Sequence, residues 1–228
     1  GSGYLFNLTD GSFYNYIYSA ADKEVIDFLI DGGGLLTNFA IQGAGDLTIR
    51  SLQAPAANIK LSGDTITIAD AGAGVELNAA NLEAAAKNVF VLGDIQTTGD
   101  VLIKASDDDA QLDVSTPQTL DDLGVGADAS GSFFDCSAGS EITVGGTIRA
   151  GGSVSLSAAT SQTRSLLDLR VDRIKDDANL LADLNFLNVK VGNAAVNITG
   201  SVIAGGSVSA AAATTIKFTV AGVSLGSK

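Results

Sequence analysis

The stretch ITVGGTIRAGGSVSLSA, which runs from Ile142 to Ala158, decides the fold of this chain. The pattern recurs without gaps as VFVLGDIQTTGDVLIKA from Val89 to Ala105 and as VNITGSVIAGGSVSAAA from Val196 to Ala212. All three copies have apolar residues at the first and third positions, glycine at the fifth and eleventh, Ile or Val at the seventh, Val at the thirteenth and Ala at the seventeenth. Their even spacing marks an internal repeat with a period of about 54 residues.

A fourth and weaker copy is predicted one period earlier in the chain. One period before Gly99 lies Gly45, where GDLTIRS resembles GDVLIKA. On this alignment the equivalent glycines are Gly45, Gly99, Gly152 and Gly206. Each copy also carries a later alternating pair, which we expect to form equivalent strands: Ile59 with Leu61, Leu112 with Val114, Leu167 with Leu169, and Phe218 with Val220.

These short strands indicate a solenoid, because no single copy can bury its own apolar face. Stacked copies pair each strand with its counterpart above and below, which makes one continuous core. We therefore predict an all-β fold, a right-handed parallel β-helix with about four repeats of about 54 residues. A repeat of that length exceeds one coil, so we expect two coils per copy, with glycines at corners that need positive φ or close approach. An antiparallel β-sandwich is the alternative.

The two ends of the chain differ from its middle. We expect residues 1–38 to form an N-terminal cap or junction, and residues 39–228 to form the solenoid in four parts, 39–88, 89–141, 142–195 and 196–228. All four tyrosines lie within the first eighteen residues, as expected of an atypical end unit that hides an open strand edge, although stacking on sugar rings is an alternative. Short helices or loops are expected at 81–87 and 176–187, and a long acidic surface insertion at 107–132.

Composition narrows the function. The 228 residues include 13 Lys and Arg and 26 Asp and Glu, so phosphate backbones and anionic membranes repel a chain of net charge −13, although the same acidity fits a soluble secreted protein. Without His, and with Cys136 as the single cysteine, Ser/His/Asp and Cys/His catalytic groups and the softer metal sites are excluded. We expect no enzyme, no nucleic-acid partner and no membrane insertion, and we expect the chain to be part of a longer precursor.

Carboxylates cluster at one place in the sequence. Asp107, Asp108 and Asp109 are consecutive, and hard oxygen ligands at that density suit Ca²⁺. This triplet is the candidate metal site, with a solvated acidic loop as the alternative, and the fold itself requires no cofactor. The stretch 43–47 is weakly similar to the glycine-aspartate loops of calcium-binding β-rolls. Asp168 and Asp172 lie among arginines and offer a catalytic alternative, which needs two carboxyl groups about 5 to 9.5 Å apart.

The segments GTIRAGGSVSLSA and GDIQTTGDVLIKA resemble the β-helical shafts of filamentous haemagglutinin-like adhesins and other giant bacterial surface proteins. The resemblance covers the three clear copies, roughly residues 89 to 220, and it lies in the style of the repeat. It implies export, a rod-shaped shaft, and roles in surface attachment, biofilm or filament formation.

We therefore expect a structural or adhesive rod module that is secreted or held on a bacterial cell surface. Its open coil edges are expected to pair with other copies of the chain or with neighbouring modules of a longer chain, and surface glycans are further expected partners. The alternative is a β-helical carbohydrate-binding or carbohydrate-active protein. A calcium-stabilised scaffold is a third hypothesis, which a calcium-dependent rise in melting temperature would support.

Overall fold

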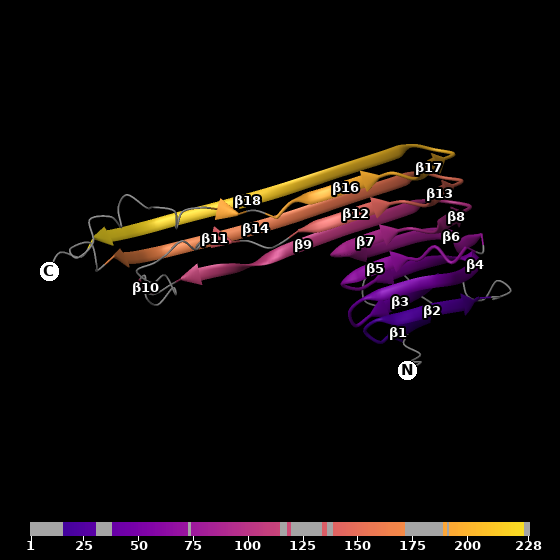
Figure 1. Ribbon diagram of the computed structural model, residues 1–228, viewed down its shortest axis with the longest axis horizontal. Helices are drawn as coiled ribbons and strands as arrows, with labels where there is room; N and C mark the ends of the chain where they lie inside the picture. Colours follow the sequence, from indigo (N-terminus) through magenta and orange to yellow (C-terminus); the bar gives the residue numbers. More distant parts are fainter. Residues whose placement is uncertain are drawn as a thin grey trace. The chain divides into compact units, whose positions relative to one another are not determined.

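The computed structural model describes residues 16–30, 38–72, 74–114, 118–119, 134–135, 139–171, 189–190 and 192–225. Within these ranges all regular structure is β-strand (Figure 1), and no helix is present that is long and apolar enough to cross a membrane. The strands are β1 (Tyr16–Ala20), β2 (Glu24–Leu29), β3 (Asn38–Gly43), β4 (Leu47–Ser62), β5 (Thr65–Ile68), β6 (Val75–Ala86), β7 (Asn88–Val91), β8 (Asp94–Thr97), β9 (Val101–Val114), β10 (Gln118–Thr119), β11 (Phe134–Asp135), β12 (Ser140–Val144), β13 (Thr147–Ala150), β14 (Val154–Val171), β15 (Val189–Lys190), β16 (Ala194–Ile198), β17 (Ser201–Ala204) and β18 (Val208–Leu225).

The chain divides into two compact units. The first unit consists of residues 1–106, 140–159 and 194–213, and the second of residues 107–139, 160–193 and 214–228. The second unit contains two short strand pairs, both parallel, in which β10 pairs with β14 and β11 with β15. The first unit contains the repeat and most of the described side chains.

Parallel strands of the first unit stack in three ladders. Ladder A contains the segments 16–20, 38–43, 58–62, 81–86 and 101–105, followed by the beginnings of β14 and β18. Ladder B contains the segments 24–26, 47–49, 65–68, 88–91, 141–144 and 194–198. Ladder C contains the segments 27–29, 51–54, 75–79, 94–97, 147–150 and 201–204. The chain therefore passes through A, B and C repeatedly, and we call one such passage a coil of this solenoid-like arrangement.

Alternation of apolar and polar residues explains why these segments become strands with one buried face. In β5, Ile66 and Ile68 are buried, whereas Thr65 and Thr67 are partly exposed. The same pattern continues through β7, β12 and β13, so the ladders enclose one hydrophobic core of Ile, Leu, Val and Ala. Among the described residues, Phe39 is the one aromatic side chain buried in this core, as expected for thin stacked layers, and Tyr18 and Phe28 pack against it while partly exposed.

The strand register confirms the equivalence of the three clear copies. Ile142 pairs with Val89 on one side and with Val196 on the other, and Ile148 pairs likewise with Ile95 and Val202. Equivalent residues of successive copies are therefore direct neighbours. The expectation of two coils per copy is wrong for these three copies, because here the ladders advance by one strand for each period of the repeat. Residues 39–88, by contrast, pass twice through A, B and C.

The long period has a simple physical origin. In ladder A, Ile59 pairs with Leu82 and Leu82 with Val101, so one coil takes about twenty residues in this part of the chain. In the later copies, residues 107–139 and 160–193 belong to the second unit and are inserted between a ladder A strand and the following ladder B strand. The copies that begin at Val89 and Ile142 are thus each one coil plus one insertion.

The equivalence of Gly45 with Gly99 is also wrong. Gly45 precedes Leu47, the first residue of a ladder B segment, whereas Gly99 precedes Val101, the first residue of a ladder A segment. The coil position next to Gly99 is held by Ala80, whose carbonyl oxygen accepts a hydrogen bond from the Gly99 N–H at 2.7 Å. The two glycines therefore occupy different corners. Ile59 and Leu61 lie in ladder A of the first unit, whereas the other alternating pairs belong to the second unit, so the first pair is not equivalent to the others.

Residues 81–87, expected as a short helix or loop, lie mostly in β6, where Leu82, Ala84 and Ala86 are buried. The first eight residues of the expected acidic insertion, 107–114, continue β9 as strand. The helix or loop expected at 176–187 and Cys136 lie outside the described residues.

Candidate functional site

The corner between ladders C and A carries a column of polar side chains that we call the polar ladder. From β3 onward, it consists of the residues that immediately precede the first inward residue of each ladder A segment: Asn38, Asn58, Asn81, Asp100, Ser153 and Ser207. Asn81 Nδ2 donates to Asn58 Oδ1, and Asn58 Nδ2 to Asn38 Oδ1, both at 2.7 Å. Sequence reasoning missed this column, although the recurrence of a short polar residue before each apolar alternation is a visible signal.

The side chains of later members of the polar ladder accept hydrogen bonds from backbone N–H groups, and Ser207 Oγ also donates to Ser153 Oγ at 3.3 Å. The N–H of Asp100 donates to Asn81 Oδ1 at 2.6 Å, and the N–H of Ser153 donates to Asp100 Oδ1 at 2.7 Å. The N–H of Ser207 donates to Ser153 Oγ at 3.2 Å. Each side chain thus satisfies a turn N–H of the next coil, which would otherwise lack a partner within its own strand.

The corner glycines are required by close approach and not by positive φ. A Cβ on Gly99 would lie 2.1 Å from Asn81 Oδ1, and one on Gly152 would lie 2.2 Å from Asp100 Oδ1. Among the described glycines, positive φ occurs only at Gly72 and Gly74. Of the two reasons offered for these corner glycines, close approach is therefore confirmed.

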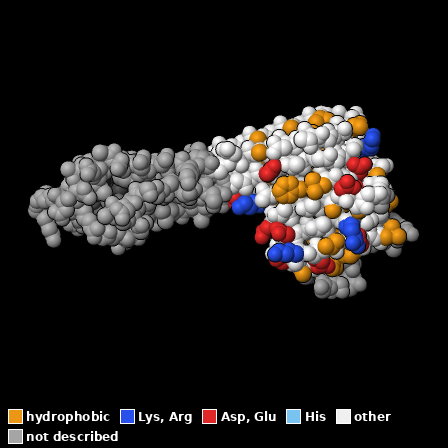
Figure 2. All heavy atoms as spheres, in the orientation of Figure 1, with side chains coloured by type: hydrophobic (Ala, Val, Ile, Leu, Met, Phe, Trp, Pro, Cys, Tyr) orange, Lys and Arg blue, Asp and Glu red, His pale blue; other side chains and the backbone are white. Residues whose placement is uncertain are grey.

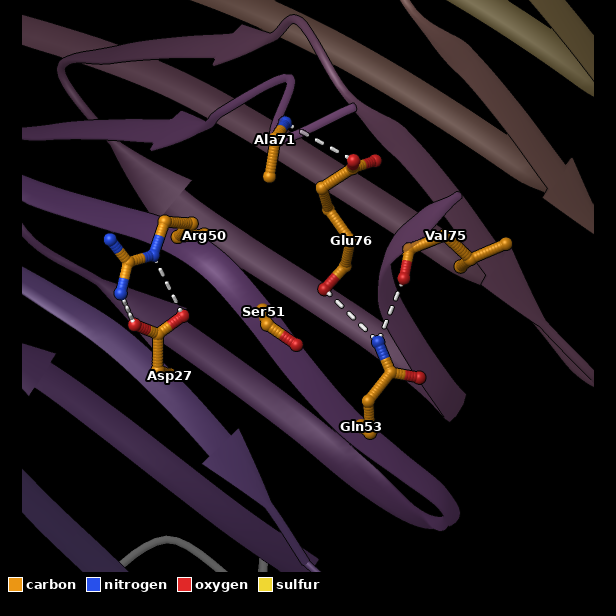
Figure 3. A pocket seen from close by; sticks show the side chains of 7 residues that line it. All are labelled: Asp27, Arg50, Ser51, Gln53, Ala71, Val75 and Glu76. Carbon is orange, nitrogen blue, oxygen red and sulfur yellow. Dashed lines mark hydrogen bonds and ion pairs between the residues drawn. The ribbon is translucent and has the colours of Figure 1, made fainter. Parts of the chain in front are cut away.

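A pocket of about 600 Å³ lies where the loop after β5 meets ladder C, and Figure 3 shows its lining. Arg50 forms an ion pair with Asp27, in which Nε and Nη2 each donate a hydrogen bond to one carboxylate oxygen. Hydrogen bonding to Asp27 raises the pKa of the Arg50 guanidinium. The amide of Gln53 donates to the carbonyl oxygen of Val75 at 2.8 Å. Asp27, Arg50 and Gln53 are thus bonded to neighbouring groups of the protein itself.

Glu76 is the one buried carboxylate among the residues lining this pocket. Only 4% of Glu76 is exposed, and its carboxylate accepts hydrogen bonds from the N–H groups of Ala71 at 3.2 Å and Asp94 at 2.7 Å. A second pocket, of about 570 Å³, shares Glu76 with Asp70, Asp94 and the glycine corner formed by Gly93, Gly146 and Gly200. Because Glu76 satisfies backbone donors of two turns, its role is to hold these turns together.

The predicted calcium triplet is only partly described. One oxygen of Asp107 accepts a hydrogen bond from the Gly139 N–H at 2.8 Å, which ties the two ends of the 107–139 insertion to each other. Asp108 and Asp109 lie in β9, but their side chains are outside the described residues. Within the described residues, no group of three or more Asp, Glu, Cys or His side chains is placed to hold a metal ion.

The sequence also pointed to carboxylates in the stretch 43–47 and at Asp168 and Asp172. The N–H of Asp46, in the stretch that is weakly similar to calcium loops, donates to Asp22 Oδ1 at 2.9 Å, so here too a carboxylate joins neighbouring coils. Asp168 lies in β14, but its side chain and the whole of Asp172 are outside the described residues.

In the first coil, the Tyr18 hydroxyl donates a hydrogen bond to Glu24. This bond lowers the pKa of Glu24 and raises the pKa of Tyr18.

The most distinctive surface of the first unit is its last coil, which we define as β16, β17 and residues 208–213 of β18. Its inward positions repeat those of the coil formed by β12, β13 and the beginning of β14. Val208 is 51% exposed, whereas Val154, one period earlier, is 1% exposed. Ile198 is 43% exposed, whereas its ladder neighbour Val144 is fully buried. Within the described residues, the last coil therefore lies at one end of the hydrophobic core.

On the face drawn in Figure 2, charges of both signs are mixed within the described residues. Figure 2 shows acidic, basic and hydrophobic side chains interspersed over the described part of one face. Lys104 Nζ and Glu83 Oε1 form an exposed ion pair at 3.9 Å. No protein-family model matches the chain, and no curated protein or solved structure matches it.

Proposed function

We propose that this chain is a structural or adhesive rod module of a secreted or cell-surface bacterial protein, and that its stacked strands are coils of a right-handed parallel β-helix. The observation that carries the proposal is the use of polar side chains between coils. Asp94, Asp100 and Glu76 all accept hydrogen bonds from backbone N–H groups of neighbouring turns. Carboxylates that join one turn to the next stabilise a continuous stack of coils, as expected of a long and stiff module.

The proposal is tested on cells of the source organism with antibodies raised against the 228-residue chain. We expect the antibodies to label intact cells or the culture medium, and a strain without the gene to attach less well to surfaces. Labelling that appears only after the cells are permeabilised, together with unchanged attachment, would contradict the proposal. Purified chain added to wild-type cells serves as a second measurement, because an adhesive module should compete for the attachment sites.

A glycan-binding role is the second candidate, and one observation favours it. Gln53, Asn78, Gln96 and Arg149 form an outward column of ladder C in consecutive register. Side-chain amides donate hydrogen bonds to sugar hydroxyls and accept hydrogen bonds from them, and the guanidinium group of Arg149 donates. A glycan array probed with the chain and with Gln96→Ala tests this role. Binding that is lost in Gln96→Ala but retained in Thr67→Ala on ladder B would support it, and an array without binding would remove it.

A further inference from the structure

We propose that the outward column of ladder C binds a linear polysaccharide that contains uronic acid residues, with Arg149 holding a sugar carboxylate. This inference rests on the glycan-binding role, the second candidate function, and names the ligand class of that same column. Three features of the described residues support it: side-chain amides that are not used within the protein, an arginine without an acidic partner, and a pocket at one end of the column.

The side-chain amides of this column are not used within the protein, in contrast to those of the polar ladder. In the polar ladder, Asn81 donates to Asn58, and Asn81 Oδ1 also accepts the N–H of the next turn. In the column, Asn78 lies between Gln53 and Gln96 in register. Within the described residues, the side chains of Asn78 and Gln96 form no hydrogen bond with protein groups. Their donors and acceptors are therefore available to a ligand.

The spacing of the column matches a chain of sugar rings. Adjacent strands lie about 4.8 Å apart, which is close to the length of one sugar residue in an extended glycan. The column continues from Gln96 to Arg149 in the same register. A linear glycan that lies across successive strands would therefore meet about one polar side chain of the column per sugar.

Arg149 indicates that the ligand carries negative charge. Its side chain is exposed and, within the described residues, pairs with no carboxylate, although the chain contains 26 Asp and Glu against 13 Lys and Arg. In the same coil, Glu141 accepts a hydrogen bond from Asn197 Nδ2 at 2.9 Å. In the preceding coil, Asp94 accepts one from the Thr147 N–H, also at 2.9 Å. An unpaired guanidinium presents the donor geometry that binds a carboxylate through two hydrogen bonds.

The net charge of the protein limits how acidic the ligand can be. A chain of net charge −13 repels densely charged polyanions, so a carboxylate on every sugar is disfavoured. Alternation of uronic acids with neutral N-acetylated sugars fits better. In that alternation Arg149 and Asn78 meet the acidic sugars, while Gln96 and Gln53 meet the neutral ones. An amide N–H donates equally to a carboxylate or a hydroxyl, and the amide oxygen accepts from an acetamido N–H.

A pocket lies at the Gln53 end of the column. The pocket of about 600 Å³ includes Ser51 and Gln53, and Figure 3 shows both side chains between the Arg50–Asp27 ion pair and Glu76. Because Gln53 Nε2 donates to a backbone carbonyl, its Oε1 remains as an acceptor, and the Ser51 hydroxyl has no hydrogen bond within the described residues. The volume is typical of small-ligand pockets. The column therefore ends in a hollow large enough for a sugar.

Isothermal titration calorimetry tests the proposal with two matched ligands. One is a hexasaccharide of alternating glucuronic acid and N-acetylglucosamine, and the other is the same hexasaccharide after its carboxyl groups are reduced to alcohols. We expect the wild-type chain to bind the acidic form about fivefold more tightly, the effect of one exposed charge-assisted contact. Arg149→Gln retains an amide but removes the charge, so it should abolish this preference and leave binding of the reduced form unchanged. Gln96→Ala should weaken binding of both ligands.

Lys104→Gln is the control for net charge, because it removes a positive charge from a side chain that is 52% exposed on ladder A, and it should retain the preference. Circular dichroism melting verifies that each variant is folded. The proposal is overturned by an absence of binding of both hexasaccharides at about 10 mM, by equal binding of the two, or by a preference that survives Arg149→Gln or is lost in Lys104→Gln. Equal binding would remove the uronic acid and leave the glycan-binding role in place. A glycan array without binding would remove that role as well, and the rod module depends on neither.

Discussion

Two successive copies of the same repeat occupy different environments in this molecule. Val154 and Val208 hold the same position of the pattern, yet one is 1% exposed and the other 51%. The difference is not in the sequence of either copy, since both read GGSVS across this corner. It arises because one coil has a neighbour on each side and the other has a described neighbour on one side only. In a stacked fold, a residue gains its stability from the next layer rather than from its own.

The largest expected effect comes from truncating the same type of side chain in the two coils. Ile148→Ala removes a fully buried side chain from ladder C and should lower the free energy of unfolding by about 3 kcal/mol. Ile198→Ala removes a side chain that is 43% exposed and should cost less than about 1 kcal/mol. Urea denaturation measures the free energy of unfolding of both variants. Equal losses would contradict an open last coil.

Corner glycines should show the next largest effect. A Cβ on Gly146 would lie 2.2 Å from the carbonyl oxygen of Gly93, a backbone atom that cannot rotate away, so Gly146→Ala should cost about 2 kcal/mol. Gly139→Ala is the control, because its nearest neighbouring atom is 3.5 Å away, and it should stay within about 0.5 kcal/mol of wild type. Thermal melting compares the two variants, and a neutral Gly146→Ala would show that the coils stack less closely here.

Substitutions in the polar ladder should also destabilise the fold more in an inner coil than in the last coil, but by smaller free energies. Asp100→Ala leaves the Ser153 N–H without its acceptor and should cost about 1 kcal/mol. At the open end, Ser207→Ala loses only a 3.3 Å contact with Ser153 Oγ and should cost under about 0.5 kcal/mol. Hydrogen exchange at the Ser153 amide provides a local measurement, since its protection should fall in Asp100→Ala alone. Unchanged protection in Asp100→Ala would contradict a stabilising hydrogen bond between the Ser153 N–H and Asp100.

The smallest expected effect is a pH dependence in the first coil. The hydrogen bond from Tyr18 lowers the pKa of Glu24 below its ordinary value of 4.5, so the folded state binds fewer protons at this group than the unfolded state. The stabilisation is present above pH 4.5 and is lost as the pH falls through the lower folded pKa. Because the pair lies near solvent, the difference between wild type and Glu24→Gln should be below about 1 kcal/mol at about pH 7 and should vanish in acid. A constant difference at all pH values would contradict this origin.

The sequence predicted the register of the repeated strands correctly where copies resemble one another. Val89, Ile142 and Val196 align by pattern and are neighbours in ladder B, because identical spacing of inward residues leaves one register that buries them all. The alternation of apolar residues likewise identified the inward face of each strand.

The length of the coil was not predictable in the same way. Insertions of similar length after Ser106 and after Ala159 keep the period nearly constant, so the pattern cannot distinguish one coil plus an insertion from two coils. The earlier coils hide the shorter period, because Ala80 and Asn81 replace the Gly-Asp pair found at 99–100. Residues 81–87 have helical propensity, and pairing on both sides overrides it.

The candidate sites were harder to predict from the sequence than the strands, as the carboxylates show. A run such as 107–109 signals charge density but not which oxygens are already engaged, and Asp107 bonds to the Gly139 N–H across the insertion. Glu76 carried no sequence signal, because its donors come from turns five and eighteen residues away that only stacking brings together.

The most direct test of the central claim is a disulfide across one repeat period. Phe90 and Thr143 are outward neighbours in ladder B that lie one repeat period apart in sequence, and adjacent strands are about 4.8 Å apart, within disulfide range. In a Cys136→Ser background, Phe90→Cys with Thr143→Cys should oxidise fully within the monomer, whereas Phe90→Cys with Asn197→Cys, two strands apart, should not. Oxidation of the second pair alone, or of neither pair, would contradict the stacking of one coil per repeat.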